Sequence, residues 1–122
     1  MADLTKEQQE DVLMFQSLQQ QLQILAMQKQ QIEAQIAELN AAEEEVKKGE
    51  GTFFRYVGSV IVPKKKDDLL KDLSVEKIDL ETRKASIDKQ EQRVKARFDP
   101  LRKKLEAQLK AQQGGGEGAE SA

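Results

Sequence analysis

The sequence contains no cysteine and no histidine. Without cysteine the chain can form neither a disulfide framework nor a thiolate metal site. Without histidine it lacks the commonest general base and the commonest metal ligand. The carboxylate runs 43–45 and 67–68 lack the spacing of a metal cage, and no Gly-rich loop precedes a helix with a phosphate-binding lysine. We therefore expect no enzyme activity, no metal site and no cofactor.

Long apolar runs are also missing. No segment approaches the roughly 18 apolar residues that a membrane span requires, and the polar N-terminus lacks the apolar core of a signal peptide. Hydrophobic residues make up 38% of the chain and charged residues 34%, with a mean hydropathy of -0.71. This composition suits a coiled coil, whose apolar residues form a narrow seam. We expect a cytoplasmic protein with no membrane partner.

Aromatic residues are scarce, at 4% of the chain, and three of them lie between residues 52 and 63. There, two apolar runs flank Gly58-Ser59, a pattern that predicts a β-hairpin over about 52–63. Its strands are apolar on both faces, and such strands require cover on both sides, which we expect one chain of this size to have nothing left to supply. We interpret the hairpin as an assembly element, whose residues are Phe53, Phe54, Tyr56, Val57, Gly58, Val60, Ile61 and Val62.

Long helices are predicted on both sides of the hairpin, over about 5–48 and 66–113. Thr5 and Gln8 fit a capping box, whereas the start near Lys66 has no good side-chain cap. Apolar residues recur at heptad spacing, which is the pattern of a coiled-coil seam. The seam positions are 15, 22, 29, 36 and 43 with 18, 25, 32, 39 and 46 in the first helix, and 73, 80, 87, 94 and 101 with 70, 77, 84, 91, 98 and 105 in the second.

Folding the helices back on each other matches these layers at one register, for example Phe15 with Leu101, Leu18 with Phe98, and residue 46 with residue 70. We therefore predict a mostly α fold, an antiparallel two-helix coiled coil capped by the hairpin. Residues 1–48 carry 4 basic and 9 acidic side chains and residues 52–113 carry 16 basic and 10 acidic, so their opposite charges favour this pairing. A parallel homodimer of each helix is the competing arrangement.

The seam stops near the ends of the two helices, yet apolar side chains continue beyond it. Apolar residues exposed there indicate contact with another molecule, although fraying ends with scattered apolar side chains are the plain alternative. These tip residues are Leu4, Val12, Leu13, Met14, Leu105 and Leu109. Nearby, Pro100 predicts a kink over about 96–99, and the glycines from residue 114 predict a disordered tail over 114–122.

A basic cluster in the second helix is the one feature that suggests nucleic-acid binding. No aromatic platform accompanies it, and the chain is acidic overall. A solvated helix face that pairs with the acidic first helix explains the cluster better, so we expect no nucleic-acid partner. Its members are Arg93, Lys95, Arg97, Arg102, Lys103 and Lys104.

The hairpin sequence over residues 54–62, together with the Gln-rich runs at 19–23 and 90–92, resembles prefoldin, and most closely its archaeal β-type subunits. The resemblance covers about residues 3–112, and its single hairpin matches β-type rather than α-type subunits. It departs from the family at the lysines near residue 66 and at Pro100.

This resemblance implies a hexamer of two α-type and four β-type subunits, whose hairpins build intersubunit β-barrels. It further implies a chaperone that holds unfolded polypeptides at its tips without ATP hydrolysis and delivers them to a group II chaperonin, with the basic cluster as a possible docking surface. The alternatives are a generic coiled-coil scaffold and a homomeric, filament-forming relative of prefoldin.

Overall fold

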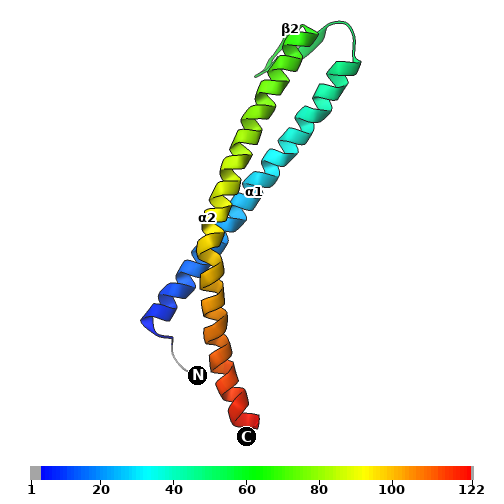
Figure 1. Cartoon of the computed structure of the whole chain (residues 1–122). Coiled ribbons are helices and arrows are strands. Elements are labelled where there is room, and N and C mark those ends of the chain that lie inside the picture. Colours follow the sequence, from blue (N-terminus) through cyan, green and yellow to red (C-terminus); the bar gives the residue numbers. More distant parts are fainter. Residues whose placement is uncertain (1–3, 122) are drawn as a thin grey trace. The chain divides into compact units, whose positions relative to one another are not determined.

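The computed structural model describes the backbone of residues 4–121 and the side chains of residues 4–112. The elements follow in the order α1 (Lys6–Lys48), β1 (Phe53–Val57), β2 (Val60–Lys64) and α2 (Lys66–Ser121) (Figure 1). The predicted architecture of two long helices joined by one hairpin is confirmed. The chain divides into two compact units, residues 27–88 and residues 1–26 with 89–122, and each unit contains a part of both helices.

The start of α1 is fixed by the predicted capping box. The Thr5 amide donates to Gln8 Oε1 at 2.9 Å, and the Gln8 amide donates to Thr5 Oγ1 at 3.0 Å. Each side chain thus satisfies an amide that the first helical turn leaves without a partner. Caps of this kind contribute about 1 kcal/mol to helix stability.

Lys66 links the end of α1 to the start of α2. Its ammonium donates to the carbonyls of Lys47 at 2.9 Å and Gly49 at 3.2 Å, which lie where α1 ends and where helical carbonyls lack intrahelical partners. The sequence predicts no side-chain N-cap at the start of α2. The lysine at this position caps the end of the preceding helix instead. A cation there also complements the negative end of the α1 dipole.

The heptad positions are the covered ones, as the sequence predicts. Every predicted seam position in α1 and α2 is buried or half-buried, while most residues between them are exposed. Leu18 is the most covered of all, at 1% exposed. Leu25 and Ile87 are also buried, each within its own unit.

In the unit formed by residues 27–88, the core lies next to the hairpin. Val46, Leu69 and Leu73 form a buried cluster, against which Phe53 and Leu70 pack from β1 and α2. The predicted proximity of Val46 and Leu70 is thus confirmed. Phe53 adds a strand residue to a helical core, and this contact positions the base of the hairpin.

In the other unit, formed by residues 1–26 and 89–122, the rings of Phe15 and Phe98 stack at 4.9 Å with an interplanar angle of 20°. In the predicted register Phe15 lies opposite Leu101 and Phe98 opposite Leu18, so the two stacked rings belong to adjacent layers. Stacking adds about 0.5–1.5 kcal/mol beyond the area that the rings bury. A heptad count treats all apolar residues alike and does not include this preference.

The structure extends α2 beyond its predicted end at about residue 113. The helix runs through Pro100 and continues to Ser121. The kink predicted near Pro100 and the disorder predicted for residues 114–122 stay predictions.

The hairpin has the predicted boundaries at its turn. The antiparallel register sets Val57 opposite Val60 and Phe53 opposite Lys64, so Gly58 and Ser59 alone form the loop. Gly58 has a φ of 63°, in the left-handed region that glycine adopts without steric cost. A positive φ at the first of two loop residues is typical of a type II′ turn, which matches the twist of the flanking strands.

Candidate functional sites: the hairpin and the tips

One face of the hairpin is covered by the chain's own α2, which corrects the expectation that the chain has nothing to cover it. Arg55 reaches α2 from β1, with Nη1 at 3.7 Å from Asp72 Oδ2 and Nη2 paired with Glu76 Oε1. Lys64 of β2 reaches the same carboxylate of Asp72 at 3.2 Å. These ion pairs are half-buried, and they hold the hairpin against α2 together with the packing of Phe53.

The other face of the hairpin is open. Phe54 is 63% exposed and Tyr56 is 73% exposed, and Ile61 shares this face because it lies opposite Tyr56 in the register. Val57 and Val60, next to the turn, are exposed as well. We call Phe54, Tyr56, Val57, Val60 and Ile61 the hairpin surface. Of the other predicted assembly residues, Phe53 and Val62 are half-buried and Gly58 forms the turn.

Five of the predicted tip residues lie on the two helices of the unit formed by residues 1–26 and 89–122, and Leu4 lies just before α1. Leu4, Leu13, Met14 and Leu109 are exposed. Val12 and Leu105 are half-buried and thus partly covered, although the sequence left them without partners. Four of the six predicted tip residues therefore face solvent.

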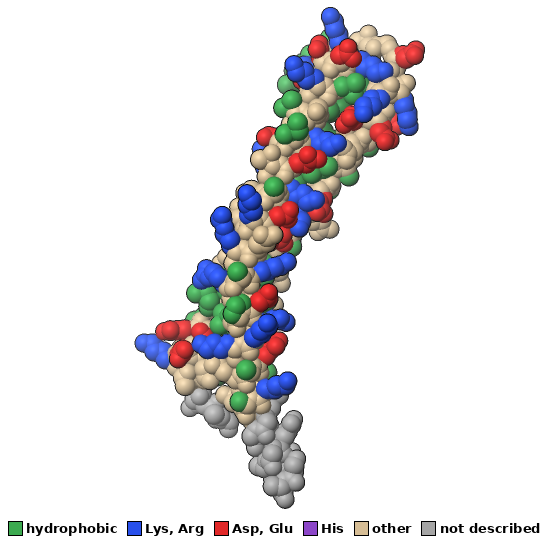
Figure 2. Space-filling model, in the orientation of Figure 1, with side chains coloured by type: hydrophobic (Ala, Val, Ile, Leu, Met, Phe, Trp, Pro, Cys, Tyr) green, Lys and Arg blue, Asp and Glu red, His purple; other side chains and the backbone are tan. Residues whose placement is uncertain are grey.

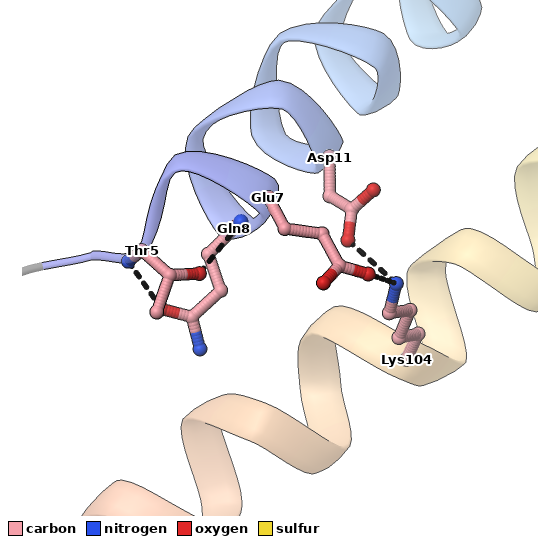
Figure 3. Close-up of polar contacts among 5 residues, drawn as sticks. All are labelled: Thr5, Glu7, Gln8, Asp11 and Lys104. Atoms are coloured by element: carbon pink, nitrogen blue, oxygen red, sulfur yellow. Dashed lines mark hydrogen bonds and ion pairs between the residues drawn. The ribbon is translucent and has the colours of Figure 1, made fainter.

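Polar contacts join the two helices beside these residues. Lys104 of α2 lies 2.8 Å from Asp11 Oδ2 and 3.2 Å from Glu7 Oε1, both on α1 (Figure 3). Hydrogen bonds from the Lys104 ammonium to Asp11 and then to Glu7 raise the pKa of Lys104 above its ordinary value. The contact between α1 and α2 therefore continues past the last apolar layer as ion pairs, so the apolar tip residues lie beside a charged seam.

The basic cluster makes contacts of this same kind. Beyond Lys104, Arg102 lies 3.9 Å from Glu106 one turn away on α2, and Arg97 donates to the Met14 Sδ of α1 at 3.6 Å. These contacts favour the interpretation of the cluster as a solvated helix face. Figure 2 shows basic and acidic side chains interspersed along the visible face rather than gathered by sign.

Two absences hold for the part of the chain that the structure describes. Among its residues, no group of three or more acidic side chains is placed to hold a metal ion. None of its helices has a stretch both long enough and apolar enough to cross a lipid bilayer.

The sequence did not predict the ion pairs that hold the hairpin against α2. A signal for them was present, because Arg55 is a charged residue within an apolar strand, and Asp72 and Glu76 are four residues apart on one face of α2. The sequence alone does not show that these residues are partners, because only the folded backbone brings residue 55 within reach of residues 72 and 76.

Comparison with known proteins places these features in a family. A family model described as "Prefoldin subunit" matches residues 9–112, a range that contains the hairpin and most of both helices. The chain belongs to the prefoldin subunit family. The predicted resemblance is confirmed.

Individual prefoldin relatives agree with this assignment. A protein named prefoldin subunit beta from Archaeoglobus fulgidus is 34% identical over 93% of this chain and 100% of its own length. The protein of the same name from Methanosarcina acetivorans is 35% identical over 88% of this chain and 94% of its own length. The crystal structure of the prefoldin beta subunit from Thermococcus strain KS-1 matches with a TM-score of 0.81 and 25% identity, over 89% of this chain and 97% of that one.

Membership of the prefoldin family defines the general role of the chain. Prefoldin subunits are chaperone components rather than enzymes, and they assemble with other subunits into a complex. The open hairpin surface and the exposed tip residues are therefore the two candidate surfaces for contacts with other chains.

Proposed function

We propose that this chain is a β-type subunit of a cytoplasmic hexamer with two α-type and four β-type subunits. In this assembly the hairpins form intersubunit β-barrels. The tips bind unfolded polypeptides without ATP hydrolysis and deliver them to a group II chaperonin. The single two-stranded hairpin supports a β-type subunit, since α-type subunits of the family carry a longer insert with two hairpins.

The exposure of Leu4, Leu13, Met14 and Leu109 is the observation that carries the client-binding part of the proposal. Unfolded polypeptides expose apolar side chains, and contact with these four residues removes apolar surface from water on both partners. The methionine adapts its shape to different partners.

Several tips acting together explain how weak contacts hold a client and still release it. Each tip offers a few apolar side chains and therefore binds weakly by itself. Multivalent binding raises the overall affinity by about 10²–10⁴-fold when several sites engage one polypeptide. No nucleotide hydrolysis is required, because each weak contact dissociates unaided.

Replacing the exposed tip residues tests this role. We expect a Leu13→Ser, Met14→Ser and Leu109→Ser variant, assembled with an archaeal α-type prefoldin subunit, to suppress the aggregation of reduced, unfolded lysozyme several-fold less well. Light scattering measures the suppression, and native mass spectrometry measures the particle. The mass should stay that of the wild-type complex.

A matched variant gives the control. Ile24, Met27 and Ile78 are as exposed as the three replaced tip residues but lie elsewhere on the helices, so their replacement by serine should leave suppression unchanged. If the tip variant and the wild type suppress aggregation equally well, the tips do not bind clients. The chain would then be a coiled-coil scaffold or, if it forms long homomeric particles, a filament-forming relative.

A further inference from the structure

One of the exposed tip residues carries a sulfur atom that peroxides oxidise. The sequence has three methionines and no cysteine, so its oxidisable sulfur groups are all thioethers. Met14 belongs to the tip and is 43% exposed. Met27 is 70% exposed, but it lies in the unit formed by residues 27–88. An oxidant in solution therefore reaches both sulfurs, and only that of Met14 is part of the tip.

The sulfur of Met14 lies beside a permanent positive charge. Arg97 of α2 donates from Nη2 to Met14 Sδ at 3.6 Å, and both residues belong to the unit formed by residues 1–26 and 89–122. A thioether sulfur is only a weak acceptor, whereas a guanidinium keeps its charge in proteins and has five N–H donors. The guanidinium is therefore placed to bind a stronger acceptor at the same position.

Oxidation supplies that stronger acceptor. A lone pair of the sulfur attacks one oxygen of hydrogen peroxide, the O–O bond breaks and a sulfur–oxygen bond forms. The departing hydroxide takes the proton left on the transferred oxygen, so the products are a sulfoxide and water. The sulfur loses two electrons and the peroxide gains them. A hydrogen bond from a charged guanidinium to the sulfoxide oxygen is stronger than one between neutral groups.

The sulfoxide changes what the tip offers to an apolar chain. Oxidation converts a flexible apolar side chain into a polar one and so disrupts methionine contacts with apolar surfaces. An apolar client that covered the sulfoxide would take its oxygen away from both water and Arg97, which costs free energy. Leu4, Leu13 and Leu109 remain exposed and apolar, so oxidation weakens the binding of clients without abolishing it.

We propose that Met14 is a reversible oxidation switch of the tip. Peroxide converts its thioether into a sulfoxide, Arg97 binds the sulfoxide oxygen, and the tip binds apolar chains more weakly. A methionine sulfoxide reductase restores the thioether with a dithiol, which becomes a disulfide while the oxygen leaves as water. This inference rests on the proposed function, in which the tips bind unfolded polypeptides.

Peroxide treatment of the assembled complex tests the switch. The wild type and Met14→Leu are each assembled with an archaeal α-type prefoldin subunit and treated with hydrogen peroxide, which catalase then removes. Peptide mass spectrometry follows the added oxygen on each methionine. We expect the oxidised wild type to suppress the aggregation of reduced, unfolded lysozyme at least ~2-fold less well than the untreated wild type, because each tip has lost an apolar contact.

Met14→Leu is the control for oxidation elsewhere, since its Met27 is oxidised as in the wild type. We expect this variant to suppress aggregation equally well before and after peroxide. Methionine sulfoxide reductases for both sulfoxide epimers should restore suppression by the oxidised wild type. Equal suppression by the oxidised and untreated wild type, or an equal loss in Met14→Leu, overturns the switch. A thioether restored without recovery of suppression also overturns it.

The melting temperature of the free chain tests the role of Arg97. In a Met27→Leu background, we expect oxidation to lower the melting temperature roughly 1–3 °C more in Arg97→Ala than in the parent, because the sulfoxide then lacks its hydrogen-bond donor. Arg93, which is also exposed and lies one turn away on α2, gives the matched control. Arg93→Ala should respond to oxidation as the parent does. An equal response in Arg97→Ala shows that Arg97 does not bind the sulfoxide.

The variant that combines Leu13→Ser, Met14→Ser and Leu109→Ser separates this inference from the proposed function. If this variant loses suppression while oxidation of the wild type has no effect, the switch is wrong and the tips still bind clients. If neither change affects suppression, both proposals are wrong.

Discussion

At the scale of single residues, lysines in this chain carry out roles that their local sequence does not indicate. Lys66 stands at the start of a helix, where a positive charge opposes the helix dipole. Its ammonium instead bonds to two carbonyls at the end of α1. Asp67 and Asp68 supply the negative charge that the first turn of α2 favours. A residue that is unfavourable for its own helix thus stabilises the neighbouring one.

Asp88 gives a residue-scale prediction of pH dependence. The Lys29 ammonium lies 2.7 Å from Asp88 Oδ1, and its hydrogen bond lowers the pKa of that carboxyl below its ordinary value. A lowered pKa contributes stability that is complete above the ordinary carboxyl value and is lost as the pH falls through the lowered one. We expect Asp88→Asn to melt roughly 1–3 °C below the wild type at pH 7. Its melting temperature should fall less than that of the wild type as the pH is lowered towards 2.

Circular dichroism melting curves across this pH range measure the effect. Asp79→Asn is the matched control, because Asp79 pairs with Arg83 at 3.9 Å on an exposed face of the same helix. That variant should keep the acid dependence of the wild type. If Asp88→Asn also keeps it, the Lys29–Asp88 pair contributes nothing to stability.

Residue-level prediction from the sequence succeeded where the partners are close together in the chain. The reciprocal bonds of Thr5 and Gln8 follow from their spacing of three residues. The stacking of Phe15 on Phe98 did not follow, because its geometry depends on ring size and on the rotation of two helices about their axes. Heptad spacing predicts which face of each helix is buried. It does not predict which side chains of adjacent layers contact each other within that face.

At the scale of elements, the hairpin and α2 behave as one piece. Phe53 packs into the helical core, and Arg55 and Lys64 pair with carboxylates of α2. The sequence predicted the hairpin, its turn and its exposed residues from β-propensity and Gly58. It did not predict that α2 covers one face, since this depends on residues far apart in the chain. The element predicted as free on both faces is therefore half-docked.

Arg55 gives a prediction at this scale. Replacing it with methionine keeps the apolar stem and removes both ion pairs to α2. We expect Arg55→Met to speed amide exchange in residues 53–64 several-fold in the free chain, because the hairpin opens locally more often. The helical signal in circular dichroism should remain unchanged, because the seam between α1 and α2 does not involve this residue.

Arg83→Met serves as the comparison for Arg55→Met. Arg83 is also an arginine paired with an aspartate, but it is exposed and its partner Asp79 lies one turn away on α2 itself. Its replacement should leave the hairpin amides unaffected. Equal exchange in the wild type and in Arg55→Met would show that Phe53 alone holds the hairpin in place.

At the scale of the whole molecule, the chain exposes apolar side chains on the hairpin and on the tips while its helices carry interspersed charge. Under the proposed function, the hairpin surface contacts neighbouring subunits and the tips contact clients. This separation predicts that either surface can be changed without loss of the other.

Introducing charge into the hairpin surface tests the assembly half of this prediction. Val60 and Ile61 are 59% and 53% exposed in the single chain, so Val60→Asp with Ile61→Asp leaves two carboxylates in water and should preserve helicity. In an assembled barrel the same carboxylates would be buried without partners, at a cost of several kcal/mol. We expect native mass spectrometry with an α-type subunit to show the complex lost for this variant. Ile24→Asp with Met27→Asp, at exposed positions of α1, should assemble as the wild type does. An unchanged complex in the hairpin variant would mean that subunits meet somewhere other than the hairpin.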